Sequence, residues 1–303
     1  MPELPEVETV KRQLQKSLVN KKIKDVFVYM DKMVKVGDGK ISNIKTGSKL
    51  ASRKFAGVLR AKKIISLDRR AKFLIIKLSG GYALLIHLRM SGQLIFLSRA
   101  MQKNPLLLSL AKTAIKQTLP TKHTHVEFVF TEGSKLFYND TRQFGHLRLV
   151  NAKEFKKVLA EAGLGPEPLK ITLRNFTALV SAHSEKPAKD FLLNQQIIAG
   201  IGNIYADESL FAAKIRPTRK VKTLKLAEIK ALHNAIKKIL TKAIKLGGSS
   251  IEYFLMTNGS AGKYTNEHEV YGRAGKPCPR CGRILKSAKI AGRTTVFCAK
   301  CQK

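Results

Sequence analysis

The sequence has no long apolar run, few acidic residues, and no cysteine before position 278. A helix that crosses a membrane needs about 20 mostly apolar residues, so we expect no membrane span. The opening residues, MPELPEVETV, carry carboxylates and lack an apolar block preceded by positive charge, so no secretory signal is readable. Neither a lipidation motif nor a basic amphipathic helix stands out. We therefore expect a cytoplasmic protein.

The scarcity of acidic residues leaves a large positive charge. Lys and Arg number 57 against 21 Asp and Glu, which gives a formal net charge of +36. That much self-repulsion is usually tolerated when the partner is a polyanion. A solubilising lysine-rich surface and an anionic membrane are the alternatives, but the missing membrane motifs favour nucleic acid. We expect a nucleoid-associated protein whose 303 residues form more than one domain.

All the cysteines lie near the end of the chain, in two CxxC pairs separated by sixteen residues: Cys278, Cys281, Cys298 and Cys301. This spacing is typical of two knuckles joined by a β-hairpin, with four thiolates around one structural Zn²⁺. A metal site in a reducing compartment fits better than a disulfide framework. Gly292 suits the hairpin turn, and Arg293 then projects from the returning strand, unless it is one more solvated charge.

The pattern along the chain predicts an α+β fold. PELPEVETVKRQLQKSL has apolar residues at helical spacing, and runs such as FLIIKL, YALLIHL and HVEFVF then predict a β-sandwich or barrel-like domain. Residues 99–118 interrupt this β-strand pattern, and within them Leu107, Leu110 and Ile115 could line a short helix. The Gly and Pro residues of GLGPEPLK are typical of a connector, and several helices are expected after it. We expect three domains: a β-sandwich at 2–150, a helical domain at 151–265 and a zinc finger at 266–303.

The N-terminus carries a candidate nucleophile. Residue 2 is small, so Met1 is expected to be removed, leaving Pro2 with a secondary amine whose pKa is near that of an α-amino group, about 7.7–8.0. Attack by this amine on a sugar carbon yields an iminium that is cationic without a proton. Glu3 and Glu6 could supply acid-base chemistry. Equally, Pro2 could merely precede a helix, and the carboxylates could complement its dipole.

Several longer motifs carry a resemblance to a known family. They are MPELPEVET, RRAKFL, HLRMSG, KHTHV, TRQFG, LGPEPL, GIGNIYADE, VYGR and the terminal zinc finger. Together they resemble formamidopyrimidine-DNA glycosylase nearly from end to end. The resemblance implies that Pro2 is the Schiff-base nucleophile, Glu3 opens the sugar ring, and Lys72 donates a proton or contacts a phosphate or the lesion during β-elimination. Arg293 then serves δ-elimination, whereas Lys72 alone would read as a solvated strand charge.

The same resemblance implies a set of DNA contacts. Met90, Arg142 and Phe144 match the residues that fill the void left by an extruded nucleotide, although Met90 and Phe144 alone would read as core residues. The helical domain matches a helix-two-turns-helix motif, in which Gly200 and Gly202 expose N–H groups and Asn203 caps a helix that cradles a phosphate. Further DNA-backbone contacts are expected from His87 and His123. A strand pair of His123 and His125, satisfied inside the sandwich, is the alternative.

The chain departs from the family pattern at three positions. Gln143 stands where a second arginine is frequent, Asn194 replaces an aspartate, and Glu185 occupies the place of a basic phosphate contact, for which Lys186 or Lys189 could compensate. We expect a monomeric enzyme that removes 8-oxoguanine and formamidopyrimidines from double-stranded damaged DNA and cleaves the abasic site by β,δ-elimination. The alternatives are an endonuclease VIII-like glycosylase for oxidised pyrimidines and a non-catalytic zinc-ribbon nucleic-acid-binding protein.

Overall fold

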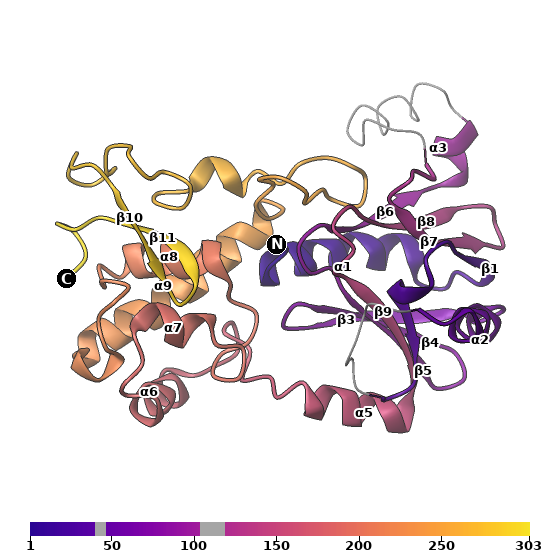
Figure 1. The fold of residues 1–303 in the computed structure, drawn as a ribbon, viewed down its shortest axis with the longest axis horizontal. Coiled ribbons are helices and arrows are strands. Elements are labelled where there is room, and N and C mark those ends of the chain that lie inside the picture. The colour runs from indigo at the N-terminus through magenta and orange to yellow at the C-terminus, as the bar shows by residue number, and fades with distance from the viewer. Residues whose placement is uncertain (40–46, 104–118) are drawn as a thin grey trace. The chain divides into compact units, whose positions relative to one another are not determined.

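The chain divides into two units in the computed structural model, which describes residues 1–39, 47–103 and 119–303. The first unit comprises Met1–Ala162 and Gly247–Lys263, and the second comprises Gly163–Leu246 and Tyr264–Lys303. Figure 1 shows the first unit as two sheets with a long helix and the second as a group of helices with a small hairpin. The three-domain division expected from the sequence stays a prediction.

The first unit begins with helix α1 (Leu4–Leu18), followed by a β-sandwich. One sheet has four strands in the order β1 (Ile23–Val28), β7 (Thr124–Phe130), β8 (Lys135–Asp140), β6 (Gly92–Leu97). The other has five in the order β2 (Val34–Val36), β9 (His146–Asn151), β5 (Tyr82–His87), β4 (Phe73–Leu78), β3 (Ile64–Arg70). Neighbouring strands are antiparallel except β2 and β9, which are parallel. In the described part of this unit, the helices besides α1 are α2 (Lys49–Leu59), α3 (Arg99–Lys103), α5 (Ala152–Glu161) and the 3-10 turn η1 (Asp31–Met33).

Helix α1 forms where the sequence predicts it, because its apolar residues recur every three or four positions. Val7, Val10, Leu14 and Leu18 are all buried and belong to one core that also takes residues from both sheets. Burying each such side chain contributes about 1.5–3 kcal/mol. The helix starts with a capping box made by Glu3 and Glu6. The core thus fixes α1 in the sandwich, and the capping box fixes the direction in which the chain enters it.

The second unit is mainly helical, as expected. Its helices are α6 (Leu173–Ala182), α7 (Ala188–Leu193), α8 (Asn203–Ala212) and α9 (Leu226–Lys245), with 3-10 turns η2 (Val221–Thr223) and η3 (Tyr264–Glu267). The hairpin of β10 (Lys286–Ile290) and β11 (Arg293–Phe297) belongs to this unit. The α+β class, with a sandwich, a helical domain and a zinc ribbon, is confirmed.

Two further expectations concern helices. Within the described ranges, every helix is either too short or too polar to cross a bilayer. The short helix expected near Leu107, Leu110 and Ile115 lies outside the described residues, which in this part of the chain form α3.

Candidate functional site

Pro2 and Glu3 lie buried at the start of α1, where Glu6 holds the backbone of Glu3. The Glu6 carboxylate accepts the Glu3 N–H at 2.7 Å through one oxygen and the Ser249 N–H at 2.8 Å through the other. Pro2 is buried, and Glu3 is only 2% exposed. A carboxylate that accepts two backbone N–H groups is held far more rigidly than a surface carboxylate. Glu6 therefore positions the first residues of the chain.

The loop that meets Glu6 is the glycine-rich segment after α9. Gly248 has φ +79°, and a Cβ there would lie 2.7 Å from Glu6 Oε1. Both the left-handed conformation and the close approach require glycine at this position. The sequence shows this loop only as a run of small residues, so its contact with the N-terminus was not foreseen.

Lys72 lies in the tight turn between β3 and β4 and is 7% exposed. Its interpretation as a solvated strand charge is therefore wrong. Arg69 holds this turn against α1: its Nε lies 2.9 Å from Glu8 Oε2, and its Nη1 donates to the carbonyl of Ala71 at 3.0 Å. Burial acts to raise the pKa of Glu8, but hydrogen bonds from Arg69 and Arg12 lower it overall. The ion pair thus fixes the turn that carries Lys72 to the helix that carries Glu3.

Met90, Arg142 and Phe144 lie on two turns of the first unit, one between β5 and β6 and the other between β8 and β9. Phe144 is 49% exposed, so its interpretation as a core residue is wrong, whereas Met90 is partly buried. The Arg142 guanidinium carbon lies 5.1 Å from the centre of the Phe144 ring. This stacking of a planar cation on an aromatic ring presents both groups at the surface.

The histidines near these turns are more buried than DNA contacts usually are. His87 ends β5 and pairs in register with His146 of β9, and the two rings stack with centres 6.0 Å apart. Burial, assisted by the charge of Arg89, lowers the pKa of His87 well below its ordinary value. A neutral imidazole can still donate one hydrogen bond to a phosphate.

His123 and His125 occupy different environments. His123 is partly exposed, and its carbonyl accepts the Asp140 N–H at 3.0 Å. His125 is buried, with Nε2 lying 2.8 Å from the Asp140 carbonyl oxygen, and burial lowers its pKa. The alternative of a pair satisfied within the sandwich therefore describes His125, while His123 remains available at the surface.

The start of α8 differs in detail from the expectation. The cap residue is Gly202, and Asn203 is the first helical residue, so the expected cap at Asn203 is wrong. Its side-chain amide instead donates to the Thr294 carbonyl at 2.9 Å, directly after Arg293. The Gly200 N–H, which was expected to be exposed, donates to Gln195 Oε1 at 2.8 Å. Asn203 thus joins the helix start to the strand that begins with Arg293.

Helix α8 also carries buried acidic residues that sequence reasoning missed. Asp207 pairs with Lys189, and its other oxygen accepts the Val296 N–H at 3.1 Å. One helical turn links Asp207 to Asn203, so the two side chains hold alternate residues of β11. Glu208 accepts the N–H groups of Glu269, Val270 and Tyr271 at 2.8–3.0 Å. Two adjacent acidic residues within a helix that is otherwise mostly apolar were the available signal.

Glu185 and Asn194, two residues that depart from the family pattern, both accept hydrogen bonds within the second unit. Glu185 accepts hydrogen bonds from Lys220 at 3.0 Å and Lys222 at 2.7 Å. Lys189 is 0% exposed and paired with Asp207, so the expectation that it could compensate for Glu185 is wrong. Lys186 is half-exposed and lies 3.2 Å from Asp190. The Asn194 side chain accepts the Gln196 N–H at 2.9 Å and so shapes the turn after α7.

The four cysteines converge as their spacing predicts. Their sulfur atoms all lie within 4.8 Å of one another, with Cys278 and Cys301 Sγ 4.0 Å apart and Cys281 and Cys298 Sγ 3.6 Å apart. A zinc tetrahedron with bonds of about 2.3 Å has sulfur–sulfur edges of about 3.8 Å. The cluster therefore fits one structural Zn²⁺, which would tie the two knuckles together. The turn residues Ala291 and Gly292 have φ 49° and 70°, and Arg293 after them is exposed.

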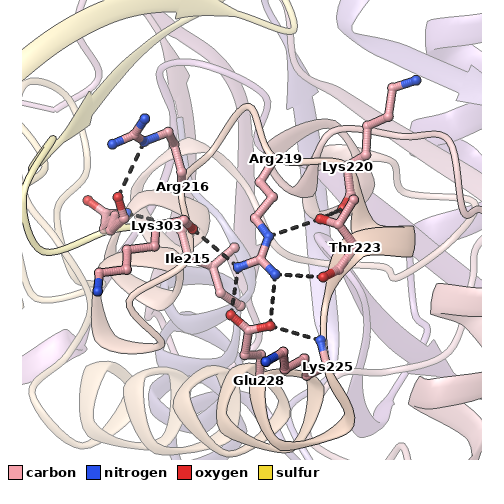
Figure 2. A network of polar contacts seen from close by, with 9 residues as sticks. Ile215, Arg216, Arg219, Lys220, Thr223, Lys225, Glu228 and Lys303 are labelled. Carbon is pink, nitrogen blue, oxygen red and sulfur yellow. Dashed lines mark hydrogen bonds and ion pairs between the residues drawn. The ribbon is translucent and has the colours of Figure 1, made fainter.

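The end of the chain is fastened to the helices by the network drawn in Figure 2. The Arg216 N–H donates to the Lys303 carbonyl at 2.9 Å. The Arg216 guanidinium also donates to the carbonyls of Gln302 and Ala299. Arg219 lies beside it and pairs with Glu228 at 2.6 and 2.9 Å. These arginines anchor the residues around the last CxxC pair, which stabilises the metal-binding fold against α9.

The predicted site residues thus form two groups in the first unit and one group in the second. In the first unit the start of α1 and the Lys72 turn meet, and Met90, Arg142, Phe144, His87 and His123 lie around the ends of β5 and β8. In the second unit Asn203 lies one residue from Arg293 through Thr294, next to the zinc ribbon.

Three family models match the chain in succession. They are the formamidopyrimidine-DNA glycosylase N-terminal domain at residues 1–147, the formamidopyrimidine-DNA glycosylase H2TH domain at 164–254, and the zinc finger found in FPG and IleRS at 275–303. The chain is 38% identical to the formamidopyrimidine-DNA glycosylase of Pelotomaculum thermopropionicum over 304 residues, which covers 100% of this chain and 99% of that protein.

Solved structures show the same similarity. Wild-type Lactococcus lactis Fpg (MutM) in complex with DNA containing N7-benzyl-Fapy-dG matches with a TM-score of 0.81 and 36% identity, covering 100% of both chains. A complex of the same wild-type protein with DNA containing an oxidised pyrimidine matches with a TM-score of 0.82 and 35% identity, again over 100% of both chains.

Proposed function

Because the chain belongs to the formamidopyrimidine-DNA glycosylase family, we propose that it removes oxidised purines from duplex DNA and cleaves the resulting abasic site by β,δ-elimination. The substrates are 8-oxoguanine and formamidopyrimidines. The main support is the burial of Pro2 and Glu3 at the start of α1, where the Glu6 carboxylate accepts the N–H groups of Glu3 and Ser249. The bond to the Glu3 N–H completes an ordinary capping box, whereas the bond to the Ser249 N–H also ties the first residues of the chain to the loop after α9.

The proposed reaction begins once Met1 has been removed. The Pro2 nitrogen attacks C1′ of the damaged nucleotide, the bond from C1′ to the base breaks, and the base leaves with a proton. Glu3 protonates the sugar ring oxygen as the ring opens, so that the nitrogen lone pair forms a C=N bond and the product is an iminium. A secondary amine is suited to this step because its iminium has no proton to lose.

Elimination follows from the iminium. It acidifies the C2′ hydrogens, and loss of one of them expels the 3′ phosphate by β-elimination. Lys72, buried in its turn beside α1, supplies the proton or the positive charge that the departing phosphate needs. Arg293, exposed at the start of β11, assists loss of the 5′ phosphate in δ-elimination. Water then regenerates the free amine of Pro2.

The base must leave the stack before it can be excised. We assign Met90 and Phe144 to the vacated space and Arg142 to the exposed edge of the orphaned cytosine, supported by the exposed Phe144 ring and the guanidinium stacked upon it. His87, His123 and Asn203 contact the DNA backbone. Extruding a base costs a few kcal/mol, which these insertions offset. The zinc ribbon holds the Arg293 strand.

The second candidate function is the excision of oxidised pyrimidines. Lactococcus lactis Fpg (MutM) was crystallised with DNA containing an oxidised pyrimidine as well as with a Fapy-dG lesion. Oxidised pyrimidines are therefore tested beside purines. The non-catalytic zinc-ribbon alternative predicts binding without covalent chemistry.

Borohydride trapping tests the proposal. The protein is incubated with duplexes carrying 8-oxoguanine or an oxidised pyrimidine and reduced, and the expected result is a covalent adduct with the purine lesion, joined at Pro2 in a mass-spectrometric map. Pro2→Gly and a protein extended by residues before Pro2 should give far less adduct. A cross-link on an internal lysine, or active protein that retains Met1, would overturn the mechanism, and a preference for the pyrimidine duplex would overturn the substrate assignment.

A further inference from the structure

One buried carboxylate joins the two turns that carry Met90, Arg142 and Phe144. Asp140, at the end of β8, is 0% exposed. Its Oδ1 accepts the hydroxyl of Ser91 and lies 3.3 Å from the Arg142 N–H. Its Oδ2 accepts the Gly145 N–H at 2.7 Å and the Tyr138 hydroxyl at 3.2 Å. Four donors therefore converge on a single side chain, one from the turn after β5 and three from β8 and the turn that follows it.

Ser91 completes the connection between the turns. Its hydroxyl oxygen accepts the Arg142 N–H at 2.9 Å while the same hydroxyl donates to Asp140. Ser91 directly follows Met90, and it is buried. Two turns some fifty residues apart in sequence are thus linked by one carboxylate and one hydroxyl. Moving either turn would break bonds made by the other.

Hydrogen bonds to Asp140 hold both ends of the turn that carries Arg142 and Phe144. Arg142 N and Gly145 N, on either side of the projecting side chains, both donate to this carboxylate. Gln143 between them has φ 59°, a conformation that a non-glycine residue adopts only when its surroundings hold it. A Cβ at Gly145 would lie 2.0 Å from the Tyr138 hydroxyl, so the approach of this backbone to Asp140 requires glycine. The turn therefore has little freedom to relax.

We propose that Asp140 is a positioning residue that holds Met90, Arg142 and Phe144 in one preset arrangement for filling the void in the duplex. This inference rests on the proposed function, since it concerns the same DNA-contacting residues. An arrangement fixed before DNA binds avoids the loss of conformational freedom that inserting mobile side chains would require. The carboxylate acts through the two turns and does not itself touch DNA.

The chemistry of the four donors requires a carboxylate. An ionised carboxylate is acceptor-only, so both oxygens can receive the hydroxyl and N–H groups. The amide of asparagine has nearly the same shape but presents an NH₂ group to at least one of these donors. A hydrogen bond to a charged group contributes enough that its loss corresponds to a change of roughly 10–100-fold in an equilibrium or rate.

The experiment compares a duplex, in which extruding the lesion leaves a gap in the base stack, with a single strand, in which no such gap forms. Asp140→Asn and Ser91→Ala are assayed on an 8-oxoguanine duplex and, by borohydride trapping, on a single-stranded oligonucleotide containing a preformed abasic site. Asp25→Asn serves as the matched control, because Asp25 lies in the same unit on β1 and pairs with Arg60. Circular dichroism and zinc content check the fold of each variant. Ser91→Ala keeps the carboxylate, so it tests the link between the turns even if Asp140→Asn is less stable.

We expect both variants to lower kcat/KM on the duplex roughly 10–100-fold while trapping on the single strand stays within about twofold of the wild type. Preference for cytosine opposite the lesion should also weaken, because Arg142 loses its fixed position. In combination with Phe144→Ala, Asp140→Asn should add little, since both changes remove the same insertion. Asp25→Asn should match the wild type.

Other outcomes would overturn the inference. Equal losses on the duplex and the single strand would mean that Asp140 only stabilises the fold, and full additivity with Phe144→Ala would mean that it does not act through the turn. Normal duplex activity in both variants would also refute it. These results differ from failure of the proposed function, in which the wild-type protein itself would give no adduct on either substrate.

Discussion

Acidification should weaken the first unit through His146, which pairs in register with His87 at the end of β5. Its ring stacks on His87, it is 2% exposed, and burial together with the charges of Arg89, Arg148 and Lys35 lowers the pKa of His146 to about 3 from an ordinary value of 6.5. In the unfolded chain the same ring regains its ordinary pKa. The folded state therefore binds the proton more weakly than the unfolded state.

The sign and size of the effect follow from this difference. A depressed histidine pKa contributes stability that is fully present above pH 6.5 and is lost as the pH falls toward 3. From pH 7 to pH 5 the loss attributable to His146 is about 2 kcal/mol, and at pH 4 it reaches about 3 kcal/mol. His87 has a pKa shift in the same direction and adds to the loss.

The prediction is tested by removing the ring. The chain has no tryptophan, so urea unfolding is followed by circular dichroism at pH 7 and pH 5 for the wild type, His146→Gln and, as a control, His183→Gln at the partly exposed end of α6. The free energy of unfolding of His146→Gln should fall about 2 kcal/mol less between the two pH values than that of the wild type, and His183→Gln should follow the wild type. Identical pH dependence in wild type and His146→Gln would refute the reasoning.

Three other perturbations test the proposed site. Glu6→Gln places an NH₂ group against the Glu3 or Ser249 N–H, so the borohydride trapping rate should fall roughly 10–100-fold with an unchanged pH profile; a shifted profile would instead indicate that Glu6 transfers protons. Arg293→Ala should reduce the δ-elimination product about tenfold or more on a sequencing gel while β-elimination persists, and Lys289→Ala in the same hairpin should change neither product. Chelation should release one zinc per chain and unfold the β10–β11 ribbon, since metal binding supplies about 10–16 kcal/mol in such modules, and amide exchange that stays slow after metal loss would contradict this.

The elements that could be predicted from the sequence are those whose cause is local. The spacing of Val7, Val10, Leu14 and Leu18 determines helix α1, because 3.6-residue periodicity places them on one face. The two CxxC pairs indicate the zinc ribbon, since this spacing is typical of two knuckles that bring four thiolates around one metal ion. The apolar pattern likewise indicated the sandwich followed by helices.

Other expectations failed or were incomplete because burial is a property of the whole fold. Lys72 looked like one lysine among several on a strand, yet the Arg69–Glu8 ion pair folds its turn against α1 and buries it. Lys189 looked available for a phosphate but pairs with Asp207 inside the helical unit. Phe144 alone resembled a core residue, but its turn projects it outward.

The sequence by itself determined the class of the fold, the metal ligands and the family motifs, because each depends on residue types at short separations. Only the tertiary structure decided which side chains hold those motifs in place. Asp140 joins turns that are about fifty residues apart, and Glu6 binds the N–H of Ser249, 243 residues further along the chain. Such hydrogen bonds have no periodicity along the sequence, since their donors and acceptors become neighbours only when the sheets and helices have packed.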